Sequence, residues 1–144
     1  MTNSLRSWLH AEGILVQDLP DFLERVKVID CRINPYWERC GMPEEHFTNA
    51  SFLLGGDEIV VGVYTKPELR LASFFHEVGH LLSRKHEGRA NWLPSWWERD
   101  AWREGFAWAA SLGVTFSPEV EAWAEAQVAT YLPEDEEVLA LTRS

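Results

Sequence analysis

The residues most able to do chemistry lie in one short run, His76-Glu77-Val78-Gly79-His80, which has the pattern H-E-x-x-H. Residues four apart lie on one face of an α-helix, so both imidazoles can reach a single metal ion. A carboxylate beside the first histidine can then hold a water at that ion and accept its proton. The spacing predicts a Zn²⁺ site with His76 and His80 as ligands and Glu77 as general base, the arrangement of a zinc hydrolase.

The residues before the motif predict the helix that must carry it. Thr65-Lys66-Pro67-Glu68 has the form of a capping box with a proline in the first turn. An apolar run, Leu69 to Phe75, then leads directly into the histidines. Gly79 lowers helix stability by about 1 kcal/mol relative to alanine. Its presence therefore predicts that another element approaches this helix closely beside the metal.

The next helix offers acidic candidates for the third protein ligand that a catalytic zinc site usually has. This helix is expected from Trp96 to Leu112. At about 100° per residue, Arg99, Asp100 and Arg103 fall on its solvated face. Glu98 falls in the middle of the apolar face, where a carboxylate is unfavourable unless it is paired or binds a metal. Glu98 is therefore the predicted third ligand.

Two alternatives to this ligand stay open. Glu104 lies at the polar border of the same helix face and is the second candidate. Glu98 could instead form an ion pair with Arg84 or Arg99, in which case a water or another residue completes the metal site.

The whole chain, residues 1–144, is expected to form one α+β domain. A strand is expected at 26–31, and residues 32–49 are expected to be an irregular loop or a substrate-facing flap. A hairpin is expected with strands at 50–54 and 58–64 and its turn at Gly55-Gly56-Asp57. Together these elements would form a small, mainly antiparallel sheet packed on the H-E-x-x-H helix and the C-terminal helices. Further helices are expected at 4–12, 18–26, 118–131 and 134–141. Ser95 is expected to cap the helix that carries Glu98, Ser117 to open the helix at 118–131, and Pro133 to end it.

Composition argues against several classes of protein. The formal net charge of −10 disfavours nucleic acid or an anionic membrane as a partner. No segment reaches the ~18 apolar residues of a membrane span, and no signal peptide is visible at the N-terminus. Cys31 and Cys40 lack the spacing of a metal knuckle and are expected to be reduced thiols. These features predict a soluble, cytoplasmic protein, and the expectation of a protein or peptide as its partner comes from the zinc-hydrolase motif instead.

Other chemistry-bearing side chains have simpler explanations. His86 is expected to be solvated at a helix end, although it could donate to an oxyanion. Tyr64 and Tyr131 could each stabilise an oxyanion, but core packing explains them better. The tryptophans near the long helix are expected to be mainly core, and an exposed subset would indicate a binding groove or protein interface. They are Trp92, Trp96, Trp97, Trp102 and Trp108.

Three features between residues 58 and 118 together resemble the ImmA/IrrE-type zinc metallopeptidases, a gluzincin-like family. A strand, Ile59-Val60-Val61, precedes a T-x-P-E helix start, and Phe74 to Leu82 is similar to the family's aromatic-rich H-E-L-G-H-L-L run. Glu98-Arg99-Asp100-Ala101 is similar to the family's E-x-E-A, whose first glutamate binds zinc. Trp102 stands where the family commonly has asparagine, and a second partial match, Glu104 to Trp108, keeps Glu104 open as a ligand.

The resemblance implies a minimal zincin-like domain that acts as a zinc-dependent endopeptidase on a specific cytosolic protein. Glu77 would be the general base, and the substrate would lie extended beside the strand at 58–64. The alternative is a non-catalytic, zinc-containing interaction domain derived from such a protease, which would be free to lose Glu77. A zinc hydrolase acting on a small amide is not distinguished from the peptidase by the sequence.

Overall fold

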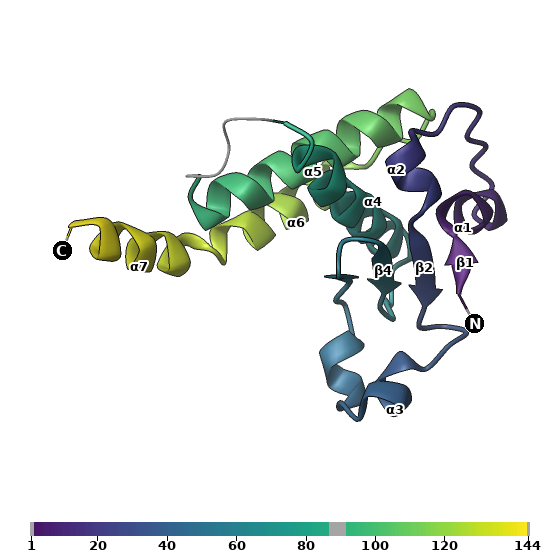
Figure 1. Ribbon diagram of the computed structural model, residues 1–144, viewed down its shortest axis with the longest axis horizontal. Helices are drawn as coiled ribbons and strands as arrows, with labels where there is room; N and C mark the ends of the chain where they lie inside the picture. The colour runs from purple at the N-terminus through teal and green to yellow at the C-terminus, as the bar shows by residue number, and fades with distance from the viewer. Residues whose placement is uncertain (1, 87–91, 144) are drawn as a thin grey trace. The chain divides into compact units, whose positions relative to one another are not determined.

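The computed structural model describes residues 2–86 and 92–143, which form an α+β structure with a small four-stranded sheet. In chain order the elements are β1 (Asn3–Ser4), α1 (Leu5–Ala11), α2 (Asp21–Glu24), β2 (Lys27–Asp30), α3 (Tyr36–Cys40), the 3-10 helix η1 (Glu44–Phe47), β3 (Phe52–Leu54), β4 (Glu58–Val61), α4 (Pro67–Ser83), α5 (Pro94–Ser111), α6 (Pro118–Ala129) and α7 (Leu132–Arg143) (Figure 1). The chain divides into two compact units, Met1–Glu77 and Val78–Ser144. Their boundary falls inside the continuous helix α4.

The sheet of the first unit has the strand order β1-β2-β4-β3 and is mixed. The two outer pairings are antiparallel, as expected, but the central strands β2 and β4 are parallel, with Val28 opposite Ile59. A parallel pair needs a long crossover, and the segment holding α3, η1 and β3 supplies one. Because β4 pairs with a strand on each side, a substrate cannot add to it as the sequence suggested; β1 and β3 form the edges of the sheet.

The hairpin β3–β4 is confirmed. Phe52 pairs with Val60, and the connection passes through Gly55 and Gly56, whose φ angles are 65° and 95°. These angles lie in the left-handed region that glycine adopts without strain. The turn therefore follows directly from the glycine pair in the sequence.

The expectation of an irregular flap over 32–49 is wrong. The segment contains α3 and η1, and α3 lies beyond the C-terminal end of β2 (Figure 1). Phe47 at the end of η1 is buried against the sheet residues Ile29 and Val60, and Tyr36 and Trp37 of α3 pack on the same cluster. Packing of these three aromatic side chains, with Phe47 buried and the other two partly buried, holds this segment in helical turns. This is a tertiary effect that its prolines and glycine do not reveal.

The first half of α4 packs on α1 within the first unit. Phe74 stacks on Trp8 with the ring centroids 4.1 Å apart, and the Trp8 indole N–H donates to the buried carboxylate of Asp30. Arg70 of α4 forms an ion pair with Glu12, the residue that follows α1. The first half of the metal-motif helix is thus fixed by apolar stacking and by a salt bridge.

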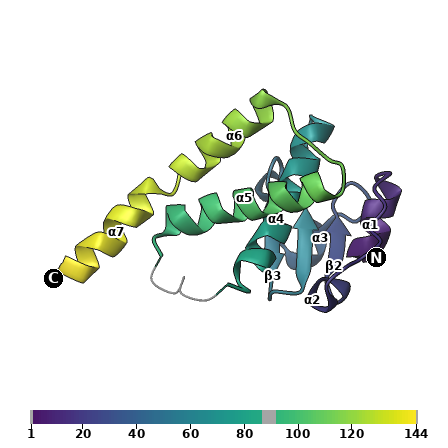
Figure 2. The ribbon, with the colours of Figure 1, turned by 90° about the horizontal axis from the view of Figure 1, so that it is seen from above.

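The second unit is helical, and α6 and α7, which follow one another in Figure 2, both contact α5. Helix α5 begins at Pro94 with Leu93 as its N-cap residue, so the expectation that Ser95 caps it is wrong. Ser95 instead lies in the first turn, and both its backbone N–H and its hydroxyl donate to Asp135 of α7. Proline suits the first helical position because it has no N–H to leave unsatisfied there.

Ser117 and Pro133 were both expected to mark helix ends, and only the expectation for Ser117 is confirmed. Ser117 caps α6 as expected, because its hydroxyl oxygen accepts the backbone N–H of Val120. Pro133 does not separate two helices, since it lies within the first turn of α7. No helix in residues 2–86 and 92–143 is both long enough and apolar enough to cross a membrane.

Candidate metal centre

Helix α4 carries both histidines of the motif on a deeply buried segment. His76 is 9% exposed and Glu77 is 6% exposed, between the fully buried residues Phe75 and Val78. His80 follows His76 by four residues on the same continuous helix, so helical geometry alone brings the two imidazoles to one face. Polar side chains at such depth are unfavourable unless they have partners or a ligand.

Glu98 of α5 meets the second histidine within the second unit. Its Oε2 lies 2.8 Å from Nε2 of His80. One donor atom from each of His76, His80 and Glu98 lies within 4.8 Å of the other two, and no other group of three histidine, cysteine or acidic residues is this compact in the described part of the chain. Two imidazoles and one carboxylate are a common catalytic zinc ligand set that leaves a fourth position for water or substrate. The donor set therefore fits Zn²⁺.

Gly79 explains how α5 comes near enough for this contact. A Cβ atom at this position would lie 1.7 Å from the carbonyl oxygen of Ala101 and 2.9 Å from the backbone nitrogen of Gly105. The backbones of α4 and α5 are therefore in direct contact beside His80. This is the close approach that a glycine inside the motif helix predicts.

Glu104, the alternative ligand, has a different neighbour. Its Oε1 lies 3.2 Å from Nε2 of His86 and 3.4 Å from the guanidinium of Arg103. The His86 side chain is half exposed, as expected for a histidine after a helix end. The structure thus brings Glu98 to His80 and Glu104 to His86; the ligand role of Glu98 stays a prediction.

Asp100 is a further candidate for a functional role, and the helical-phase argument placed it on the wrong face of α5. The sequence put it on the solvated face of α5, but it is 4% exposed. One carboxylate oxygen accepts the hydroxyl of Ser83 from α4, and the other pairs with Arg103. The helix contact is wider than the apolar stripe, because two polar side chains that hydrogen-bond each other can be buried at its border. The sequence feature that could have indicated a role for Asp100 is its place at the second acidic position of the E-x-E-A pattern.

Tyr64 stands beside the proposed general base within the first unit. Its hydroxyl donates to Ser73 at 2.6 Å and lies 3.1 Å from the hydroxyl of Ser51. Burial raises the pKa of Tyr64, and the negative charge of Glu77 raises it further. Ser73 precedes Glu77 by four residues on α4, so a protonated phenol is held about one helical turn from the carboxylate.

The tryptophans around α5 divide into buried and exposed members. Trp102 is buried and packs edge-on against Phe106 and Trp123, as expected for core. Trp96 is 47% exposed, so the expectation of a mainly core cluster is wrong at this position. Trp92 lies against it with the ring centroids 6.4 Å apart. The second unit thus has both buried and exposed aromatic side chains.

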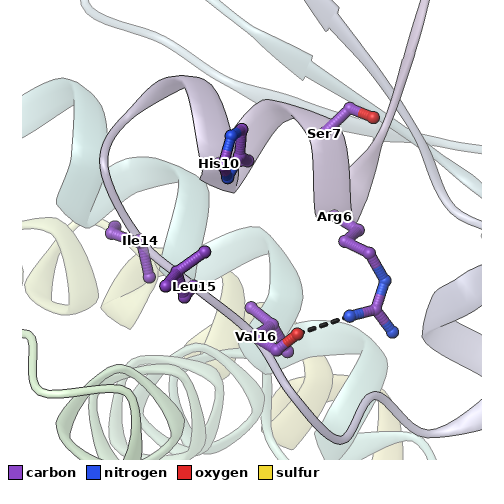
Figure 3. Close-up of a pocket in the computed structure, with 6 residues that line it drawn as sticks. All are labelled: Arg6, Ser7, His10, Ile14, Leu15 and Val16. Atoms are coloured by element: carbon purple, nitrogen blue, oxygen red, sulfur yellow. Dashed lines mark hydrogen bonds between the residues drawn. The ribbon is translucent and has the colours of Figure 1, made fainter.

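A surface hollow in the first unit lacks the set of side chains that the candidate metal centre has. Figure 3 shows Arg6 donating to the backbone carbonyl of Val16 across it. The exposed side chain of Leu15 forms part of its wall, and His10 is the one imidazole among its lining residues. The lining residues are Arg6, Ser7, His10, Ile14, Leu15 and Val16. With no carboxylate in that set, this hollow does not resemble a metal centre.

Comparisons with protein-family models, curated proteins and solved structures return no match to this chain. The likeness to the ImmA/IrrE-type peptidases therefore rests on the motif residues themselves.

Proposed function

We propose that this chain is a zinc-dependent endopeptidase of minimal zincin-like architecture, in which His76, His80 and Glu98 hold the ion. The observation that carries the proposal is the 2.8 Å contact between His80 and Glu98, with His76 one helical turn away on the same helix. This set of two nitrogen donors and one oxygen donor suits zinc and leaves one coordination position for chemistry.

Glu77 would move the proton in this reaction. When bound, zinc supplies Lewis acidity, which polarises the scissile carbonyl and brings the pKa of a water toward ~7. The Glu77 carboxylate accepts a proton from the attacking water and passes it to the nitrogen of the leaving amine. Glu77 is 6% exposed, so its carboxylate lies away from bulk water at the place where the proposed reaction would occur.

The neighbours of Glu77 would tune its environment. The raised pKa of Tyr64 keeps its phenol neutral at physiological pH. A neutral hydroxyl near the carboxylate adds no second negative charge, so it does not repel the ionised form of Glu77. His76 and His80 must likewise be neutral to present a nitrogen lone pair, so metal binding would weaken in acid.

The proposed mechanism is tested by Glu77→Gln. The variant should keep its fold and its zinc but lose hydrolysis by a factor on the order of 10²–10⁴, because an amide cannot accept the proton. It would serve as a substrate trap, and wild type loaded with Zn²⁺ would then be assayed for cleavage of the trapped protein. Glu104→Gln is the matched control and should cleave normally. Equal turnover by wild type and Glu77→Gln would refute the mechanism.

A second candidate function is a zinc-containing interaction domain without catalysis. The observation that favours it is that three large apolar side chains of the second unit, Trp96, Leu132 and Leu141, are exposed. Where such side chains form one patch, they often mark a site that binds another protein. The two functions separate in the same experiment: a partner that binds wild type and Glu77→Gln equally and is never cleaved identifies the interaction domain.

A further inference from the structure

The proposed mechanism leaves one buried acid of α5 without a role. Asp100 is 4% exposed, and its partner Ser83 is fully buried. A buried carboxylate is unfavourable unless donors surround it. Two donors from the described residues help to meet this need: the Ser83 hydroxyl from α4 donates to Oδ2, and the exposed guanidinium of Arg103 donates to Oδ1.

The Ser83–Asp100 hydrogen bond lies next to the proposed ligands on both helices. Ser83 follows His80 by three residues on α4, and Asp100 follows Glu98 by two residues on α5. The direct backbone contact at Gly79 lies within the same short stretch. Two contacts between α4 and α5 therefore lie close to the 2.8 Å approach of Glu98 to His80.

These contacts define the register of α5 on α4. A shift of α5 by one residue moves each side chain by about 1.5 Å along the axis and about 100° around it. Such a shift would leave the Asp100 carboxylate buried without the Ser83 hydroxyl and would turn Glu98 away from His80. An aspartate side chain is short and has little freedom to follow, so its hydrogen bond is satisfied in one register only.

We propose that Asp100 is a positioning residue for the metal centre: by accepting the Ser83 hydroxyl, it sets the register of α5 and aims Glu98 at His80. The inference rests on the proposed zinc site and gives Asp100 no ligand role. Arg103 neutralises the carboxylate from the solvent side and is not part of the link between the helices.

The experiment uses the full chain. Zn²⁺ affinity is measured by competition with a chromophoric chelator, and the stability of the zinc-free protein is measured by urea unfolding. Asp100→Ala and Ser83→Ala should each weaken zinc binding about 10-fold, the lower end of the effect of residues that orient ligands. The double variant should be no weaker than the worse single one, because both changes remove the same bond.

Two further variants separate positioning from charge and from general stability. Asp100→Asn should restore most of the affinity, because its amide oxygen still accepts from Ser83 while the exposed Arg103 swings away from the amide nitrogen. Arg103→Met, which removes a second partner of the same carboxylate, should bind zinc like wild type. If Asp100→Ala proves unfolded, Ser83→Ala, which leaves the acid in place, decides the question.

The outcomes distinguish this inference from the proposed function. Wild-type affinity in Asp100→Ala or in Ser83→Ala overturns the positioning role and leaves the zinc site standing. An Asp100→Asn variant as weak as Asp100→Ala also overturns it, because charge would then be what matters. Wild type that binds no zinc overturns both proposals. The expected affinities combined with full activity of Glu77→Gln would refute the catalytic mechanism alone.

Discussion

Two histidine–glutamate pairs of the second unit consist of the same residue types and have similar distances between the imidazole nitrogen and the carboxylate oxygen. Nε2 of His80 lies 2.8 Å from Glu98, and Nε2 of His86 lies 3.2 Å from Glu104. Their surroundings differ. The side chains of His80 and Glu98, the inner pair, are 18% and 11% exposed, and those of His86 and Glu104, the outer pair, are 50% and 21% exposed.

This difference shows that burial and a third donor separate a candidate metal centre from an ordinary ion pair. An exposed pair gains about 0–1 kcal/mol, because water already solvates both partners. The inner pair has given up most of that water, and His76 on the same helix adds a further nitrogen donor. The inner pair therefore has more to gain from a cation than the outer pair has.

The largest expected effect concerns the histidines. Wild type should bind about one Zn²⁺ per chain, whereas His76→Ala or His80→Ala should abolish tight binding because a nitrogen ligand is lost. His86→Ala, the matched change in the outer pair, should leave the stoichiometry unchanged. Metal analysis of the purified proteins measures this. Full zinc content in a variant lacking both His76 and His80 would disprove the site assignment.

The next effect compares the two glutamates. Glu98→Ala should weaken zinc binding by more than the ~10–100-fold typical of residues that only orient a ligand. Glu104→Ala should change it little, because that carboxylate lies beside His86. Competition with a chromophoric chelator gives both affinities. A larger loss in Glu104→Ala would reverse the assignment of inner and outer pairs.

A smaller effect is expected at Gly79, which allows α5 to approach the inner pair. Alanine should favour the helix by about 1 kcal/mol, but overpacking against the Ala101 carbonyl costs roughly 1–3 kcal/mol or more. The clashing atoms are backbone, so no side-chain truncation in α5 can relieve them. Urea unfolding should show net destabilisation together with weaker zinc binding. The control is Ala107→Gly, exposed on α5, which should lower stability and leave zinc affinity unchanged.

The smallest effect concerns Asp30, a buried acid of the first unit that has a permanent cation beside it. Burial raises its pKa, but hydrogen bonds from Arg32 and Trp8 outweigh burial and hold the pKa below the ordinary 3.8. The folded state therefore releases this proton more readily than the unfolded chain does. The resulting stability is complete above pH 3.8 and is lost as the pH falls through the folded-state pKa.

Asp30→Asn should remove this contribution, about 1–2 kcal/mol at pH 7. The stability difference between wild type and Asp30→Asn should shrink as the pH is lowered below 3.8. Urea unfolding of both proteins across this range measures it. A difference that stays constant with pH would show that the charge of Asp30 is not what stabilises the first unit.

Local sequence was sufficient for the features that local chemistry controls. The T-x-P-E start and the apolar run predicted α4, and the glycine pair predicted the turn of the β3–β4 hairpin. Helical spacing placed His76 and His80 on one face, because an α-helix repeats whatever its surroundings are. Ser117 capped α6 as expected, since its hydroxyl satisfies a backbone N–H in its own turn.

Tertiary structure decided what depends on partners distant in the chain. Residues 32–49 form helical turns because Phe47 is buried against the sheet, and β2 and β4 are parallel because that segment serves as a crossover. Asp100 is buried, against its helical phase, because Ser83 of another helix donates to it. The sequence could name Glu98 and Glu104 as candidates, but only the packing of α5 on α4 could bring one of them to His80, since the distance between two helices is not encoded in the period of either.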